Sequence, residues 1–436
     1  MSAAEPIPSA RRPGIFAGIT RNVVLVGLVS FFTDAASEMI FPLMPVFLSL
    51  ASVGGGVSVA LIVGVLEGLA ETTSALLKLW AGALTDRIQR KKPFVLIGYG
   101  ISSVVRPLTG LAAAWWHPVA IRLADRIGKG VRSAPRDVLI AESTPAEYRG
   151  KAFGFHRSMD HLGAVAGPLL AVFLLFVLEK PGLGEAGKEA LLRTIFLISA
   201  VPGLICLAII LFCLRDAHAA REGRPFRPAW RVFSAEYRLY LASLLLFTLG
   251  NSTDMFLVLR AAEVIRAETA AFARGTMALA MVPLLWAFFH AFKTLTVAPL
   301  GSLSDRVGRR SLIRLGWGIY ALVYLGFGLM NRAWQAWPLF ALYALYYGFT
   351  EGSEKALVVD LAPAGLRGTA VGMYHFTIGL ASLPASILFG LVYAKLGAMT
   401  AFGYAAVLAV LATILLHVRV SGRLRPTAPS PRPHIP

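Results

Sequence analysis

Seven charged side chains lie close together in one stretch of an otherwise apolar chain, and their types suit the binding of ions or charged solutes. The charged members of this stretch are Arg122, Asp125, Arg126, Lys129, Arg132, Arg136 and Asp137. On a helix, at about 100° per residue, all seven fall within an arc of roughly 140°. A charge placed in hydrocarbon costs about 2.5–3.5 kcal/mol on insertion scales. This face must therefore turn to water, to protein or to a charged ligand.

Two pairs of carboxylates in the apolar segments before this stretch have the spacing of proton carriers. Asp34 and Glu38 are one helical turn apart, and Glu67 and Glu71 repeat that spacing in the next segment. A carboxylate in surroundings of low dielectric is protonated more readily than in water, and a neighbouring arginine restores the ionised form. A proton and a substrate could thus compete for one cluster of carboxylates and arginines. Asp34 and Glu38 are either coupling residues of this kind or members of buried pairs.

The arginines have a structural interpretation beside the functional one, because carboxylates on the same helix and on neighbouring segments can pair with them. Arg122 and Arg126 lie deep in the expected span and fit a cavity that binds substrate or protons. Arg106, in the preceding span, fits the same cavity or an interior ion pair. The residues expected near the cytoplasmic mouth, with a structural or gating role, are Arg132, Arg136 and Asp137.

Further candidates lie on the fifth expected span and in the second half of the chain. His156 and Asp160 are one turn apart and form either a proton relay or a structural pair. Their spacing is not specific for a metal ion, so we predict no metal site. Asp254 and Glu351 are the candidates of the second half for substrate or proton binding.

The composition indicates a polytopic, all-α membrane protein. The chain has 436 residues, of which 56% are hydrophobic, and this exceeds the 45–50% typical of soluble domains. About 20 residues span a bilayer, and we predict twelve spans at 22–50, 57–80, 93–113, 117–141, 151–178, 192–214, 236–260, 276–300, 311–331, 335–361, 367–394 and 397–419. The net charge of +18 lies mainly in alternate loops, which indicates cytoplasmic termini rather than binding of nucleic acid.

The chain also repeats itself at an offset of half its length. GALTDRIQRKK at 82–92 matches GSLSDRVGRRS at 301–311, an offset of 219, and further matches lie at 218 and 220. Three matches at one offset predict a duplicated six-helix unit, and such parallel repeats place a site between the halves. The expected divisions are a cytoplasmic tail at 1–21, bundles at 22–214 and 236–419, a linker at 215–235 and a disordered tail at 420–436.

The repeat also predicts a contact between the two cytoplasmic mouths. In the alignment of the halves, Arg136 and Asp137 correspond to Glu354 and Lys355, so the order of charges is inverted. We expect these pairs to meet across the pseudo-twofold axis when the cytoplasmic side is shut.

Three motifs make the chain resemble the major facilitator superfamily over nearly its whole length. The first, at residues 82–91, is a loop motif that recurs at 301–310, and the resemblance assigns a cytoplasmic gate to Gly82, Asp86, Arg87 and Arg90 and to Gly301, Asp305, Arg306 and Arg309. The second, Arg126-x-x-Lys129-Gly130, is similar to the fourth-span motif of drug–proton antiporters. The third, Gly163-x-x-x-Gly167-Pro168, is similar to the start of their fifth-span motif and implies close helix packing.

The resemblance implies a secondary transporter with two pseudo-symmetric six-helix bundles rather than an enzyme, and no cofactor is expected. The two span motifs favour proton-coupled export of a small solute by alternating access. Proton-coupled uptake of an organic anion, or a membrane sensor with a transporter fold, are the alternatives. The expected partners are the solute, protons and the lipid bilayer. We expect a monomer in a plasma membrane, such as a bacterial inner membrane.

Overall fold

The computed structural model describes residues 19–50, 56–85, 90–145, 148–179, 183–216, 232–269, 277–363 and 366–419. All regular structure in these ranges is helical. The first half contains α1 (Arg21–Ile40), η1 (Phe41–Leu43), α2 (Met44–Leu50), α3 (Val59–Thr85), α4 (Lys92–Val105), η3 (Arg106–Leu111), α5 (Trp116–Glu142), α6 (Arg149–Leu178), α7 (Glu185–Ile198), α8 (Ala200–Ala208) and η5 (Ile209–Cys213). The second contains α9 (Ala235–Gly250), α10 (Met255–Thr269), α11 (Met277–Val307), α12 (Arg309–Leu329), η7 (Ala333–Gln335), α13 (Ala336–Leu361), α14 (Arg367–Leu396) and α15 (Ala398–Arg419).

These elements form twelve crossings, as the sequence predicts. Ten of the crossings within the described residues are long and apolar enough to span a membrane, and the other two are α5 and α13. Four predicted boundaries are wrong by five residues or more. The second crossing ends at Thr85 rather than 80 and the eighth at Val307 rather than 300, whereas the sixth begins at Glu185 rather than 192 and the seventh ends at Thr269 rather than 260. The sixth and seventh crossings continue past the apolar segment through charged turns, where side chains such as Arg193 form ion pairs.

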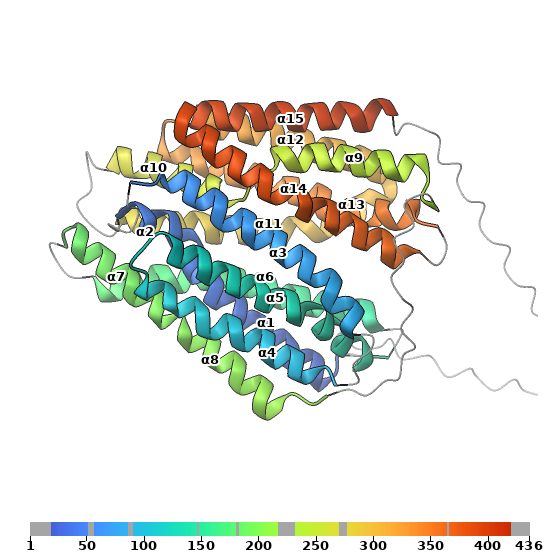
Figure 1. Cartoon of the computed structure of the whole chain (residues 1–436), viewed down its shortest axis with the longest axis horizontal. Helices are drawn as coiled ribbons and strands as arrows, with labels where there is room; N and C mark the ends of the chain where they lie inside the picture. The colour runs from blue at the N-terminus through green and yellow to red at the C-terminus, as the bar shows by residue number, and fades with distance from the viewer. Residues whose placement is uncertain are drawn as a thin grey trace, which may run out of the picture.

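The twelve crossings divide into two bundles that lie side by side (Figure 1). The described chain ends, Ile19 and Arg419, lie at one end of the molecule, which we call the terminal end; the opposite end is the far end. Most of the predicted linker and tails, at 217–231, 1–18 and 420–436, lies outside the described residues.

The bundles meet closely where α3 of the first packs along α14 of the second (Figure 1). Glycines allow this approach. A Cβ atom on Gly390 would lie 2.7 Å from the carbonyl oxygen of Ala60, and one on Gly64 would overlap the carbonyl of Ser386. Small residues of this kind let helix backbones approach in a membrane, where apolar side chains gain little by leaving lipid. A second inter-bundle contact joins α6 to α11.

One crossing of the second bundle is interrupted in its middle. The helix α9 ends at Gly250, and α10 begins at Met255. Asn251 has φ −93° and ψ 84°, which is not helical, so the chain changes direction there. The corresponding crossing of the first bundle stays helical, because the turn η1 joins α1 directly to α2.

Candidate functional site

Two adjoining cavities lie between the bundles. The smaller, of about 370 Å³, is lined by α1, α3, α5, α11, α13 and α14 and by the break between α9 and α10. The larger, of about 510 Å³, extends from it towards the terminal end. Four charged or ionisable residues line both cavities: Glu38, Arg126, Lys129 and His290. Ionisable side chains at membrane depth thus face a shared interior passage, which is where such residues occur in transporters.

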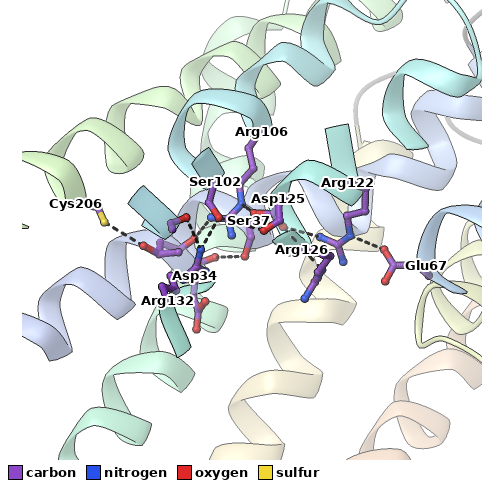
Figure 2. A network of polar contacts seen from close by, with 12 residues as sticks. Asp34, Ser37, Glu67, Ser102, Arg106, Arg122, Asp125, Arg126, Arg132 and Cys206 are labelled. Carbon is purple, nitrogen blue, oxygen red and sulfur yellow. Dashed lines mark hydrogen bonds and ion pairs between the residues drawn. The ribbon is translucent and has the colours of Figure 1, made fainter. Parts of the chain in front are cut away.

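A network of ion pairs fixes the buried face of α5, with Asp125 at its centre (Figure 2). Asp125 is 2% exposed. Its carboxylate accepts a hydrogen bond from Nε of Arg106 at 2.8 Å, and it lies 3.8 Å from Arg122 and 3.9 Å from Arg126. Arg106 also donates to the carbonyl of Thr33 at 2.8 Å. The Asp125 carboxylate therefore neutralises cations from two helices, and Arg106 connects this network to α1.

The two arginines nearer the centre have second acidic partners on α3. Nε of Arg122 donates to Glu67 at 2.7 Å, and Arg126 lies 3.3 Å from Glu71. The Glu67 side chain is 3% exposed, whereas that of Glu71 is 48% exposed. The structural ion-pair network that the sequence allowed is therefore present.

The two carboxylates of α1 have different surroundings from those of α3. Asp34 lines the larger cavity, and no cation pairs with its carboxylate among the described residues. Glu38 accepts a hydrogen bond from Nε1 of Trp286 at 2.7 Å, which joins the first bundle to the second. The Trp286 ring also stacks on Phe41 with centroids 5.0 Å apart. Asp34 and Glu38 therefore lie on the cavity wall without the arginine partners of Glu67 and Glu71.

Two glycines of α6 bring that helix against α1 at the level of these carboxylates. A Cβ atom on Gly163 would lie 3.1 Å from Cβ of Asp34, and one on Gly167 would lie 2.9 Å from Cβ of Glu38. Pro168 follows within the same helix. The predicted packing role of this motif thus places α6 directly behind the carboxylates.

Asp254 lies in the break between α9 and α10, on the wall of the smaller cavity. The hydroxyl of Tyr343 donates to its carboxylate at 2.6 Å and that of Tyr347 at 3.0 Å. Asp34 and Asp254 correspond in the repeat, at an offset of 220 residues, but only Asp254 accepts hydrogen bonds from phenol groups among the described residues.

The predicted residue Glu351 of α13 forms an ion pair with α6, across the two bundles. Arg157 of α6 pairs with Glu351 of α13, and Lys293 of α11 lies 3.4 Å from the same carboxylate. His156 and Arg157 each lie 3.8 Å from Asp160. Glu351 thus holds the bundles together beside the larger cavity, and His156 and Asp160 form the expected local pair.

The predicted contact between Arg136 and Glu354 does not form in this structure. Arg136 pairs with its neighbour Asp137 at 2.8 Å. Glu354 is 6% exposed and accepts hydrogen bonds from Trp317 at 2.9 Å and Tyr374 at 2.8 Å, inside its own bundle. Both carboxylate oxygens of Glu354 are therefore engaged away from the first bundle.

Arg132 and Lys355 are the neighbours of these residues at the predicted mouths. Arg132 donates to the Ser102 hydroxyl and lies over the Tyr99 ring at 4.3 Å, so it packs α5 on α4. Lys355 lines the larger cavity instead of pairing with Asp137.

The remaining predicted gate residues lie only partly within the described residues. Asp86 and Arg87 lie outside the described residues, as do the surroundings of Gly82 and the side chain of Asp305. Arg90 and Arg306 are exposed, and Arg309 pairs with Asp360 at 2.8 Å. A Cβ atom on Gly301 would meet no atom within 4 Å, whereas one on Gly352 of α13 would lie 3.8 Å from the Cα of Gly301.

Three lining residues were absent from the predicted site. Lys78 and Lys129 line the larger cavity, and His290 lies where the two cavities adjoin. The spacing of Lys129 on the charged face was a usable signal, whereas nothing in the sequence around His290 marks it. Among the described residues, no group of three His, Cys, Asp or Glu side chains has an arrangement able to hold a metal ion.

Comparison with known proteins gives consistent matches along the chain. The family model of the Major Facilitator Superfamily matches residues 26–386 and 291–434. An uncharacterized MFS-type transporter of Methanocaldococcus jannaschii is 34% identical over 398 residues, which cover 91% of this chain and 94% of the relative. A multidrug resistance protein, MdtG, of Klebsiella pneumoniae is 26% identical over 301 residues, which cover 67% of this chain and 68% of the relative. The solved structure of a D-xylose-proton symporter aligns with a TM-score of 0.71 at 16% identity, covering 93% of this chain and all of that one.

Proposed function

This chain belongs to the Major Facilitator Superfamily, and on that premise we propose that it exports a small solute in exchange for protons. The membrane-embedded bundles would rock about the contacts of α3 with α14 and of α6 with α11, exposing the shared cavities to one side at a time. Relatives named multidrug resistance proteins support the outward direction.

The observation that carries the proton coupling is the state of the two carboxylates on α1. Asp34 and Glu38 line the cavity without an arginine partner, whereas Glu67 and Glu71 are paired. A buried carboxylate that has no ion-pair partner receives less stabilisation of its charged form than a paired one, so a proton binds it more readily. Substrate arrival and protonation can then exclude each other at one wall, which is the requirement for exchange.

The geometry at the far end supports a state that is open towards the terminal end. Trp286 stacks on Phe41 there, and Arg266 lies 2.8 Å from Glu185 and 3.3 Å from the Ser49 hydroxyl. We place the terminal end in the cytoplasm, because the cation-rich connections lie there. The structure would then represent the inward-facing state that accepts a solute for export.

Proton movement in inverted membrane vesicles tests this function. The vesicles are acidified inside, a panel of solutes is added outside, and a substrate should cause proton efflux. Asp34→Asn should abolish the efflux, and Glu38→Gln should reduce it, because each removes a proton carrier. Glu189→Gln serves as control, since Glu189 pairs with Arg193 outside the cavities. Efflux in Asp34→Asn vesicles equal to that of the wild type would refute the assignment.

A further inference from the structure

Five of the six arginines that line the two cavities are already committed to acidic partners, and Arg132 packs on Ser102 and Tyr99. Arg106, Arg122 and Arg126 each lie within an ion pair of the first bundle. Their partners on α3 and α5 include two carboxylates that are 2% and 3% exposed. A substrate that drew these arginines away would leave a buried carboxylate unpaired, which is strongly unfavourable. The cations available to a ligand must therefore be sought elsewhere on the wall.

Three lysines fit this requirement. Lys78, Lys129 and Lys355 line the larger cavity, and none of their ammonium groups has an ion pair or hydrogen bond within the part of the chain that the structure describes. The other lysine on this wall, Lys293, is paired with Glu351 and lies 3.7 Å from the centre of the Tyr347 ring. The three unpaired ammonium groups are thus distinct from the paired cations around them.

The three lysines form one cluster whose members come from both bundles. Lys78 on α3 and Lys129 on α5 belong to the first bundle, whereas Lys355 on α13 belongs to the second. All three line the larger cavity, where Lys78 repels the other two ammonium groups, and the half-exposed carboxylate of Glu71 attracts Lys78 and Lys129. An anion placed among them would relieve this repulsion in both bundles at once.

The lining of the larger cavity also carries more positive than negative charges. Nine lysines and arginines line the larger cavity, but only four carboxylates do. Asp125 and Glu351 lie behind this wall, Glu71 lines the adjoining smaller cavity, and all three pair with lining cations, which brings the acids to seven. Two positive charges remain without an acid, in a space large enough for a small metabolite.

A neutral contact for such a ligand lies beside Lys129. His290 of α11 lines both cavities together with Lys129, and neither of its ring nitrogens has a hydrogen-bond partner among the described residues. Buried polar atoms are nearly always hydrogen-bonded, so an unpartnered imidazole on a cavity wall is a candidate ligand contact.

We infer that the transported solute is an organic anion, and that its acidic group binds among Lys78, Lys129 and Lys355 while His290 contacts it from the second bundle. This inference rests on the proposed transport function and specifies the chemical class of its substrate. Two acidic groups, or one of double charge, would match the surplus of the wall. The arginines position the helices and the lysines bind the solute.

Ligand binding by the purified full-length protein gives the first test. The probes are benzoate, phthalate and trimellitate, whose charge rises in that order, with neutral dimethyl phthalate as the control for size. We expect phthalate and trimellitate to raise the unfolding temperature and dimethyl phthalate to leave it unchanged. Lys129→Gln should weaken phthalate binding at least about tenfold, the usual effect of losing a hydrogen bond to a charged group.

Matched variants separate binding from folding. Lys129→Arg should retain phthalate binding, and Lys395→Gln, at the exposed end of α14, should match the wild type. Lys129→Gln should unfold no earlier than the wild type without ligand, because no acidic partner is lost. The inference is overturned if none of the carboxylates stabilises the protein, or if their effect persists when all three lysines are glutamine.

Proton movement in vesicles distinguishes this inference from the exchange function. Proton efflux driven by neutral or cationic solutes, but not by anions, would overturn the anion site and leave proton exchange standing. Binding of anions through the lysines without any proton efflux would support the site and refute proton exchange. Efflux driven by anions and lost in Lys129→Gln would support both.

Discussion

Replacing Asp125 by asparagine tests the ion-pair network most directly. The carboxylate is 2% exposed and lies within 2.8–3.9 Å of three guanidinium groups. Asparagine keeps the shape of the side chain and removes its charge. Arg122 and Arg126 keep a second acid on α3, but Arg106 loses its only ion pair among the described residues.

The magnitude follows from the burial of this pair. The side chain of Arg106 is 8% exposed, and breaking a buried pair costs about 3–5 kcal/mol because the remaining charge stays in low dielectric. The unfolding equilibrium should therefore shift by roughly two to four orders of magnitude. Glu71→Gln is the matched control, since the side chain of Glu71 is 48% exposed. Arg126 keeps Asp125 at 3.9 Å when Glu71 loses its charge, so the loss in this control should be smaller than that of Asp125→Asn.

Unfolding of the purified protein by increasing mole fractions of dodecyl sulfate, followed by its helical circular dichroism, measures both changes. A second control is the double variant Arg106→Gln with Asp125→Asn, whose effect should be much smaller than the sum of the two single effects. Equal, small losses for Asp125→Asn and Glu71→Gln would show that Asp125 does not anchor the network.

Three other outcomes follow from the contacts between the bundles. Gly64→Leu should destabilise the protein by about 1–3 kcal/mol and abolish transport, because it overpacks the contact of α3 with α14. Gly154→Leu is the control: it has open space around it and should change the free energy of unfolding by less than about 0.5 kcal/mol. Equal effects of the two substitutions would refute the packing argument. Reversing the charge of Arg157 or of Glu351 alone should reduce transport, and reversing both should restore it to within about tenfold of the wild type if each single loss reflects their ion pair. Trp286→Ala should destabilise the closed far end by about 3–5 kcal/mol. A cysteine introduced into the smaller cavity should then react with a membrane-impermeant thiol reagent added at the far end. Unchanged labelling would show that Trp286 does not close this end.

The crossings and the pairing partners of α5 could be predicted from the sequence. Apolar segments of membrane length mark the crossings, and the arc of charge on α5 requires acids nearby. Glu67 and Glu71 have the spacing to supply them, and the structure pairs them with Arg122 and Arg126. A periodic pattern carries this information because successive helical turns present the same face.

The contacts between the two bundles could not be predicted in the same way. Gly301 belongs to a recognisable motif, but a Cβ atom added there would meet no atom within 4 Å, whereas Gly64 and Gly390 belong to no motif and lie at the close contact of α3 with α14. Spacing along one helix does not reveal which face meets a helix more than 300 residues away. Glu354 shows the same limit, because its partners Trp317 and Tyr374 lie in its own bundle.

The glycine contact between α3 and α14 also bears on how such a protein can acquire new substrates. The two helices touch through backbone atoms, so no side-chain change at Gly64 or Gly390 can adjust their separation without forcing the bundles apart. The lysines and carboxylates of the cavity wall carry no such restriction. Single substitutions on the cavity wall can therefore change the substrate of this transporter while the contact between α3 and α14 stays the same.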